Sequence, residues 1–512
     1  MKKSYRIAIA LAVAGMTFST AVTSFAAPAV SPNAQLSSYV YDYMEKLDGL
    51  GYLPDMRIGA KPYDRLQMAR WLVKIEAALS RDAAAPVYAK GMVSELRREF
   101  AAELQMLDGS GKVPEIQMKE LNLQAVHYKG DTLQTDTGSN YCPVYQPLNI
   151  NNNGYDYGRN INGVLTMKGE GYLSHHTVLS VTPRVAYSAD DSGVSLESAY
   201  IKTHYNNVAI QVGKNELWWG QGYRGSVGFT NNATPQTSLH LSAVKPHKSK
   251  GFFKFLGEIQ PSFFYSVLDA NRSDVPHPSL VGMRTDFTPS QNFTFAFART
   301  SIIGGKGHSL AGITDYWHFL TGKNSTSSAN DKWNSIAGMD FRWRFPHMNG
   351  MQFYGEMYGE DQATGQNGLI PLPTNLSFVA GTYIPRLSKD GSWDLRLEGG
   401  KTHEEMYLHW AYTEGYTHLG RLMGDAMGNR ATRYYGKLTH YHGSGLQLSL
   451  HAEHLKMNQD TSSLQKVNSY WLSARKQLDA NTAITASAGV AKVEDKGSKK
   501  NYLMSLGVTQ RF

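Results

Sequence analysis

The sequence lacks the features of a disulfide-bonded scaffold and of a helical membrane protein. Among its 512 residues it has one cysteine, Cys142, so no disulfide can form within the chain. Exported proteins often contain disulfides, but a large closed strand ladder does not need them, and we interpret Cys142 as an incidental loop thiol. Beyond the first thirty residues there is no apolar run of the roughly 20 residues that a membrane-spanning helix requires.

Blocks of one charge and catalytic motifs are also missing. The formal net charge is only +8, and no lysine or arginine block indicates nucleic acid as a partner. No nucleophile elbow, zinc-protease motif or phosphate-binding loop occurs. The stretch 403–407 begins like a zinc motif but ends in Tyr407 instead of histidine, and the neighbouring His175 and His176 would point to opposite faces of a strand. We therefore expect no enzyme activity, no metal site and no cofactor.

Aromatic residues and glycine are abundant instead. The chain contains 30 Tyr, 9 Trp, 19 Phe and 48 Gly, yet its mean hydropathy is −0.39. Many aromatics in a chain of moderate hydrophobicity are typical of strands that show one face to lipid and the other to water.

The first segment, residues 1–26, reads as a secretory signal peptide. Lys2, Lys3 and Arg6 precede an apolar stretch, and a small-x-small cleavage site ends at Ala26. We expect the mature chain to begin at about Ala27, which lowers the formal charge from +8 to +5.

Residues 27–115 are predicted to form a small periplasmic helical bundle. One helix carries apolar residues at helical spacing from Val40 to Leu50; a second begins after Pro62 with Asp64 as its N-cap; a third follows Pro86 and continues to Leu107. The bundle would pack on the rest of the chain, and the cell wall and capsule-export machinery are candidate partners for it.

Residues 116–512 are predicted to form a transmembrane antiparallel β-barrel, so the fold class is mainly β. Apolar and polar residues alternate over 340–345, 393–398 and 446–453, and charged side chains on the alternate face must point into a wet interior. We count about 18 such segments. The last one ends at Phe512, and a terminal aromatic residue is typical of strands read by the outer-membrane insertion machinery. Localisation in the outer membrane, with its lipids as neighbours, follows.

One segment stands out within the barrel. Residues 218–226 read Trp-Trp-Gly-Gln-Gly-Tyr-Arg-Gly-Ser, and Asn-Asn-Ala follows at 231–233. Aromatic rings can stack on the apolar faces of sugars, while amides and a guanidinium bind hydroxyls or carboxylates. The same pattern is compatible with a loop folded into the lumen whose aromatics pack against the wall. The residues alone leave both interpretations open.

The segment resembles the hallmark of the capsule assembly protein Wzi family, in which Trp-Trp-Gly-x-Gly-x-x-Gly-Ser precedes Asn-Asn-Ala. Residues 282–284, 355–361 and 415–424 resemble later family stretches, so the resemblance covers about 160–430. Asp425 departs from it, because the family more often has histidine there, which puts polar contacts at that position in doubt.

The resemblance implies an 18-stranded outer-membrane lectin, with a periplasmic helical bundle, that binds capsular polysaccharide and anchors it to the cell surface. It also implies a polysaccharide-binding segment with a second group of candidates, which are alternatively a lumen salt-bridge network. The first group is Trp218, Trp219, Gln221, Tyr223, Arg224, Asn231 and Asn232, and the second is Arg284, Glu356, Glu360 and Asp361.

Two alternatives remain at this point. A carbohydrate-selective porin would have a similar composition and would differ in conducting ions. An outer-membrane lipase or protease ranks last, because no nucleophile and base occur in a recognisable arrangement.

Overall fold

The structure of the chain is a computed structural model. It describes residues 28–53, 56, 59–110, 113–136, 141–188, 192–308, 314, 333–360, 375–495 and 497–512. The expected signal peptide and its cleavage site lie outside these residues, as does Asp361.

A closed antiparallel barrel makes up most of the described chain. Its eighteen described strands each pair with their neighbours, and the first closes the barrel against the last through the register Glu120↔Arg511 to Lys129↔Tyr502. This confirms the predicted fold class and strand number. The strands are β2 (Gln117–Lys129), β5 (Asn160–Ser174), β6 (Thr177–Ser188), β7 (Ser192–Tyr205), β8 (Val208–Lys214), β10 (Thr237–Ala243), β12 (Glu258–Val267), β13 (Ser279–Ser290), β14 (Phe293–Ile303), β15 (Trp333–Phe345), β16 (Met351–Gly359), β17 (Ser377–Ile384), β18 (Trp393–Lys401), β21 (Thr432–His442), β22 (Leu446–Met457), β23 (Gln465–Gln477), β24 (Thr482–Glu494) and β25 (Ser498–Arg511).

The two faces of the wall follow the alternation of the sequence. In β15, Arg342 and Arg344 are buried inside the barrel, whereas Trp343 between them is 50% exposed on the outside. In β25, Met504 and Leu506 are exposed on the outer face. Charged side chains are costly on a lipid-facing surface, so this arrangement of residues drives the sheet to close around a polar interior.

Short elements lie at the two ends of the barrel and in its lumen. Seven of the described elements are two-residue strands, and one 3-10 helix follows the fifth of them. They are β1 (Ala60–Lys61), β3 (Leu133–Gln134), β4 (Val144–Tyr145), β9 (Trp218–Trp219), β11 (His247–Lys248), β19 (Thr417–His418), β20 (Arg421–Leu422) and η1 (Gly251–Leu256).

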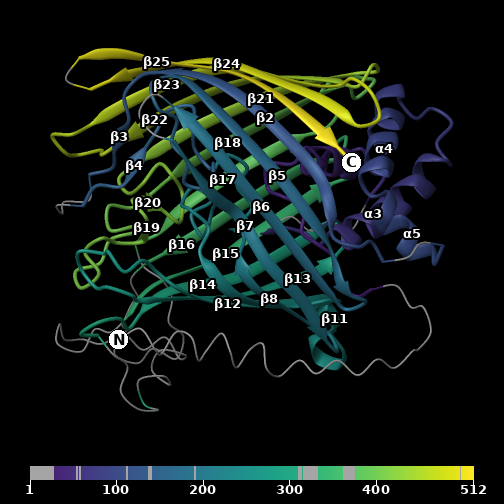
Figure 1. Ribbon diagram of the computed structural model, residues 1–512, viewed down its shortest axis with the longest axis horizontal. Coiled ribbons are helices and arrows are strands. Elements are labelled where there is room, and N and C mark those ends of the chain that lie inside the picture. The colour runs from purple at the N-terminus through teal and green to yellow at the C-terminus, as the bar shows by residue number, and fades with distance from the viewer. Residues whose placement is uncertain are drawn as a thin grey trace.

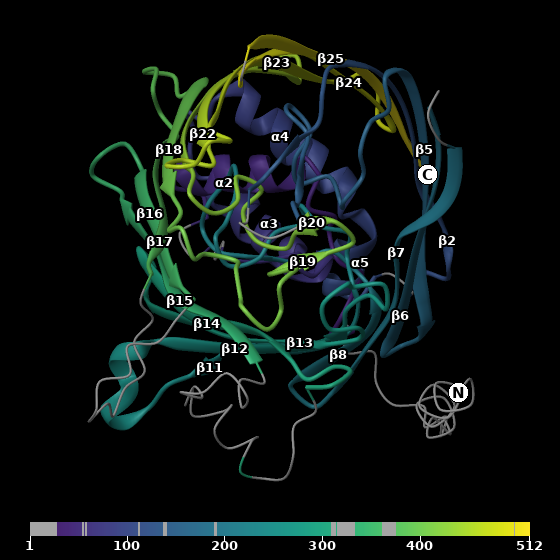
Figure 2. The same ribbon diagram turned by 90° about the vertical axis from the view of Figure 1, so that its left-hand side faces the viewer.

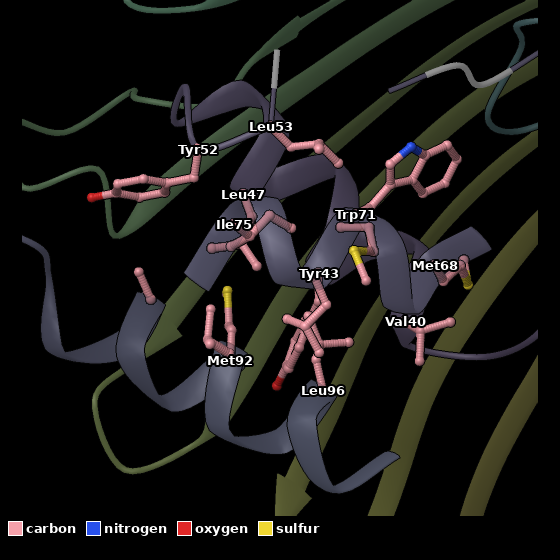
Figure 3. Close-up of a cluster of buried hydrophobic side chains, with 14 of the residues drawn as sticks. Val40, Tyr43, Leu47, Tyr52, Leu53, Met68, Trp71, Ile75, Met92 and Leu96 are labelled. Atoms are coloured by element: carbon pink, nitrogen blue, oxygen red, sulfur yellow. The ribbon is translucent and has the colours of Figure 1, made fainter. Parts of the chain in front are cut away.

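Four α-helices precede the barrel in the described chain: α2 (Val40–Gly49), α3 (Arg65–Leu79), α4 (Val87–Glu99) and α5 (Ala101–Asp108). Helices α3, α4 and α5 gather at the end of the barrel where the C-terminus lies (Figure 1), and α2 lies inside the ring of strands. Their shared core includes Tyr43, Leu47, Ile75 and Met92 (Figure 3). Tyr441 of the barrel wall joins this core, so the helices pack on the barrel as well as on one another.

The helix boundaries agree with the sequence at the first two helices and differ at the third. The Asp64 side chain caps α3 by accepting from the Leu66 amide at 3.0 Å. The single helix expected after Pro86 is wrong, because the chain breaks at Phe100 into α4 and α5. Arg65 explains the break: its guanidinium lies 5.0 Å from the Phe100 ring and binds the carboxylates of Glu99 and Glu103, both at 2.7 Å.

The helical end is the periplasmic end. The strands are joined there by short turns such as 206–207, 291–292 and 443–445, and at the opposite end by long segments such as 130–159, 215–236 and 402–431. Short periplasmic turns and long extracellular loops are the rule in outer-membrane barrels. Seen from the extracellular end, these long loops cross the lumen in front of the helices (Figure 2).

Candidate functional site

Helix α2 is held in the barrel by a ladder of charges. Asp42, Glu45 and Asp48 recur every third residue and so share one helix face. Asp42 pairs with Lys437 and Glu45 with Arg396, each at 2.7 Å. Asp48 is shared by two wall arginines, 342 and 344. Asp48 and the four cationic partners are buried, and Asp42 and Glu45 are half-buried, so removing one partner would leave an uncompensated charge largely out of water.

The tryptophan segment lies in the loop between β8 and β10, which folds inward. Trp218 and Trp219 form β9, which pairs with β1 just before the second helix: Ala60 lies opposite Trp219 and Lys61 opposite Trp218. Trp219 also exchanges two backbone hydrogen bonds with Phe229, at 3.0 and 3.2 Å. Backbone pairing therefore joins the loop directly to the helical part of the chain.

A wall carboxylate fastens the tip of this loop. Glu356 of β16 accepts from the amides of Gln221 at 3.0 Å and Val227 at 2.7 Å, and lies 3.0 Å from the Ser226 hydroxyl. A carboxylate that accepts several N–H groups forms strong, charge-assisted bonds. One side chain of the barrel thus satisfies both limbs of the loop.

Two further wall carboxylates complete the attachment. Glu398 of β18 accepts from the amides of Tyr223 at 2.6 Å and Arg224 at 3.1 Å. Glu453 of β22 binds the Arg224 guanidinium at 2.5 Å, which also lies 4.8 Å from the Trp471 ring. These three glutamates lie on one arc of the wall, from β16 to β22, which in the strand order is opposite β8 and β10, so the loop is tied across the barrel.

Close approach explains two glycines of the motif. Gly220 has φ +132°, and a Cβ there would lie 2.0 Å from both the Glu356 carboxylate and the Ser226 hydroxyl. A Cβ at Gly225 would lie 2.3 Å from the Asp425 carboxylate. Gly220 and Gly225 therefore lie where carboxylates pack so closely against the loop backbone that a side chain would not fit.

Tyr223 connects the loop to α2. Its ring stacks on Tyr435 at 6.3 Å, with Arg396 and Lys437 over it at 4.5 and 4.6 Å. Its hydroxyl donates to Asp42 at 3.2 Å. Burial opposes the ionisation of Asp42, but the positive charges of Lys437 and Arg396 hold its pKa below the usual range.

The remaining predicted residues lie in the same interior region. Asn231 donates to the carbonyl of Asn151 at 3.0 Å, and Asn232 to that of Leu422 at 3.0 Å. Arg284 is paired with Asp340 at 2.5 Å, and that carboxylate also accepts from the Gln221 side chain at 2.7 Å. Glu360 accepts from the Tyr407 amide.

A second inward loop, residues 402–431 between β18 and β21, packs against the first. The Tyr407 hydroxyl donates to the Val227 carbonyl at 2.9 Å, and its ring stacks on Tyr416 at 5.8 Å. Asp425 forms two parallel bonds to Arg433 at 2.6 and 2.7 Å. This pairing was not predictable from the sequence, because no motif links the two residues.

The predicted residues are therefore brought together, but as the interior of a plug. Trp219 is 1% exposed, and Trp218, Gln221, Asn231 and Asn232 are also buried. Tyr223 and Arg224 are half-buried. The aromatic side chains of the segment pack inside the lumen. Of the second group, Arg284 pairs with Asp286 and Asp340, whereas Glu356 and Glu360 accept hydrogen bonds from loop amides.

Exposed aromatic and charged side chains, which could contact a sugar, lie elsewhere on the extracellular end. Trp410 of the second inward loop is 55% exposed. A cleft of about 840 Å³ opens between the segment 130–159 and the last barrel strands, lined by Tyr157, Arg159 and Lys499 among others. Arg159 and Lys499 flank Asp131 at 3.4 and 2.8 Å. Nothing in the local sequence marked these residues, because exposure at a rim is decided by the fold.

Among the described residues, no group of three or more His, Cys, Asp or Glu side chains is placed to hold a metal ion. No helix in this part of the chain is both long and apolar enough to cross a bilayer.

Comparison with known proteins identifies the chain's relatives. The family model described as capsule assembly protein Wzi matches residues 144–501. The "Uncharacterized 55.8 kDa protein in cps region" of Klebsiella pneumoniae is 28% identical over 178 residues, 34% of this chain, and the chain spans 35% of that relative's own length.

Among solved structures, the chain is similar to Wzi of Escherichia coli, described as an outer membrane protein involved in group 1 capsule assembly and as a carbohydrate-binding β-barrel. The TM-score is 0.71 at 17% identity, and the match covers 94% of this chain and 100% of that one. That likeness shows a shared fold. With a family match over most of its length and this closed barrel, the chain is an outer-membrane protein that belongs to the capsule assembly protein Wzi family.

Proposed function

We propose that the protein binds capsular polysaccharide on its extracellular face and anchors it to the cell surface during capsule assembly, without catalysing a reaction. Family membership supports the role in capsule assembly. The carbohydrate binding described for the Escherichia coli structure supports the ligand class. The observation that carries the proposal is a plug of two inward loops, tied to the wall by Glu356, Glu398 and Glu453, which supports a fixed outer surface.

Trp410 is the first proposed contact. A flat ring that is 55% exposed on an extracellular loop can lie against the apolar face of a sugar. The loop is held by the Tyr407 and Asp425 contacts, and Arg430 pairs with Glu404 at 2.6 Å within it. A ring on a fixed loop loses little conformational freedom on binding.

The second proposed contact is the cleft at the rim. Arg159 and Lys499 present exposed cations on either side of Asp131, and these can bind carboxylates of an acidic polymer. Each such contact is weak in water and screened by salt. A repeating polymer can engage several of them at once, and linked weak contacts then add to a firm attachment.

The tryptophan segment supports the binding surface from inside the lumen. Trp218, Trp219, Gln221, Tyr223, Arg224, Asn231 and Asn232, together with Arg284, Glu356 and Glu360, would serve polysaccharide binding by holding the extracellular loops in place. Asp361, the next residue in the sequence after Glu360, stays a proposed member of this group. Replacing Trp218 and Trp219 should therefore release capsule while the barrel still assembles.

The alternative function, a carbohydrate-selective porin, would need an open lumen. A porin requires a continuous water-filled path, whereas the two loops and α2 pack against each other and against the wall here. We expect purified protein in planar bilayers to conduct little current. A large steady current from the wild-type protein would favour the porin and count against the anchor.

Binding of labelled capsular polysaccharide to the purified protein tests the proposal. Trp410→Ala should weaken binding at all salt concentrations, because stacking does not depend on charge. The double variant Arg159→Ala, Lys499→Ala should weaken it mainly at low salt. Leu419→Ala is the matched control, since Leu419 is exposed on the same loop as Trp410 but has no ring. Equal binding by all of these variants would contradict the proposed surface.

A further inference from the structure

An exposed aromatic turn projects from the periplasmic rim of the barrel. The segment 244–257 joins β10 to β12 and contains β11 and η1. In η1, Phe252, Phe253 and Phe255 are 85%, 57% and 63% exposed. Phe252 contacts the other two rings at 5.4 and 6.2 Å. Three large apolar side chains clustered on a turn in water form the kind of patch that marks an interaction surface.

The turn is also positively charged. It contains no Asp or Glu, and its cationic side chains are all exposed: Lys245, Lys248, Lys250 and Lys254, with His247 between them. Other turns at this end of the barrel, such as 291–292 and 443–445, are much shorter. Aromatics beside lysines are typical of segments that lie at a membrane interface, where rings enter the acyl boundary and ammonium groups meet phosphates.

Backbone contacts fix the turn to the wall. Ser249 donates to the Gly257 carbonyl from both its amide, at 2.9 Å, and its hydroxyl, at 2.6 Å. Gly257 has φ +69° and lies so close to β13 that a Cβ would meet the Thr288 carbonyl oxygen at 1.8 Å. The Phe cluster is therefore held in a set direction. In both overall views the turn beside β11 projects sideways beyond the barrel wall (Figures 1 and 2).

The outer surface next to this turn is an aromatic girdle. Phe287 of β13 directly precedes Thr288, the residue that Gly257 approaches, and its ring stacks on that of Phe295 in β14 at 4.8 Å. Phe293 and Trp343 continue the row at 5.8 Å. Aromatic girdles mark the level of the membrane interface on outer-membrane barrels. The turn leaves the wall at that level, so a sideways course brings its rings to the lipid.

We propose that segment 244–257 is a membrane-interface anchor that binds anionic phospholipid of the periplasmic leaflet. Phe252, Phe253 and Phe255 enter the acyl boundary, and the four lysines bind headgroup phosphates. Such an anchor fixes the depth and rotation of the barrel in the membrane independently of any polysaccharide bound at the other end.

The test uses the full chain in vesicles of phosphatidylethanolamine and phosphatidylglycerol. In a Cys142→Ser background, Phe253→Cys is labelled with an environment-sensitive nitrobenzoxadiazole dye. Phe353→Cys, on the lipid-facing girdle, is the positive control, and Lys389→Cys, on another exposed periplasmic turn, is the negative one. The dye at 253 should show a blue-shifted emission and quenching by spin-labelled lipid close to that at 353. Iodide in the buffer should quench it far less than the dye at 389.

A second variant separates the headgroup contact from the apolar one. In vesicles of pure phosphatidylcholine, which carry no net charge, the dye at 253 should show a smaller blue shift. Changing the four lysines to glutamine should reduce the blue shift at 253 in vesicles that contain phosphatidylglycerol and leave the shift in pure phosphatidylcholine unchanged. Iodide quenching at 253 as strong as at 389 would overturn the proposal. So would protection that develops only when a periplasmic extract is added, because that result would assign the turn to a protein partner.

Discussion

Removing the carboxylate of Glu356 should release the plug from the wall. In the variant Glu356→Ala, the amides of Gln221 and Val227 lose their acceptor while remaining buried. The Ser226 hydroxyl is less affected, since it lies 2.6 Å from the Trp219 carbonyl and can donate there instead. The cost therefore comes from two orphaned backbone donors and from the cavity left by the side chain.

The magnitude follows from those two donors. A buried donor without a partner costs about 1–3 kcal/mol, so two cost about 2–6 kcal/mol. The lower value, about 2 kcal/mol, applies if water enters the vacated space. Because about 1.4 kcal/mol is a factor of ten, even that value should raise the population of the detached loop roughly 30-fold.

Trypsin cleavage after Arg224 measures this population. The Arg224 side chain is tied to Glu453 and its amide to Glu398, so cleavage requires detachment. When opening and closing are fast, the cleavage rate tracks the open population, and we expect it to rise at least about 30-fold in Glu356→Ala. Ion conductance in planar bilayers should rise in parallel.

Glu405→Ala is the control, since Glu405 is an exposed glutamate of the second inward loop. It should leave both the cleavage rate and the conductance unchanged. If Glu356→Ala matched the wild-type protein in both assays, the attachment of the loop by wall carboxylates would not be what keeps it in the lumen.

Three other sites in the lumen and its loops respond to single substitutions. Gly220→Ala places a Cβ 2.0 Å from the Glu356 carboxylate, so it should also increase cleavage of the loop and conductance. Asp48→Ala leaves two buried arginines unpaired and should lower stability by about 3–5 kcal/mol in thermal unfolding, whereas the exposed Asp108→Ala should change it little. Burial raises the pKa of Glu216, in the loop after β8, from 4.5 to about 7. Between these two pH values the folded state keeps a proton that the unfolded chain has released, so the free energy of unfolding should fall as the pH rises from 4.5 to about 7 and level off above it. Glu216→Gln should remove that slope.

Much of the fold was predictable because it follows from local periodicity. A two-residue alternation shows which side chains face lipid and which face the lumen, and Arg342, Trp343 and Arg344 lie as that pattern predicts. The start of α3 was predictable from Asp64, since capping involves only neighbouring residues. The break at Phe100 was not, because it depends on Arg65, which is distant in the sequence.

The sequence was enough to predict which residues form the special loop, but not which of them are exposed and which are packed inside. The composition of residues 218–232 pointed to a special loop, and its glycines did mark close approaches. Composition does not show what approaches, however. The same aromatics, amides and arginine suit a sugar or a packed interior equally, and only the positions of the surrounding strands decide between them.

The sequence by itself determined that this chain alternates two faces along about eighteen segments and begins with helices. The tertiary structure decided that Glu356, Glu398 and Glu453 meet one loop, and that Trp410 stays outside while Trp219 is enclosed. The physical reason is distance along the chain. Periodicity is a property of neighbours, whereas a carboxylate and the amide it binds here are joined only when the barrel closes and brings strands more than a hundred residues apart to the same lumen.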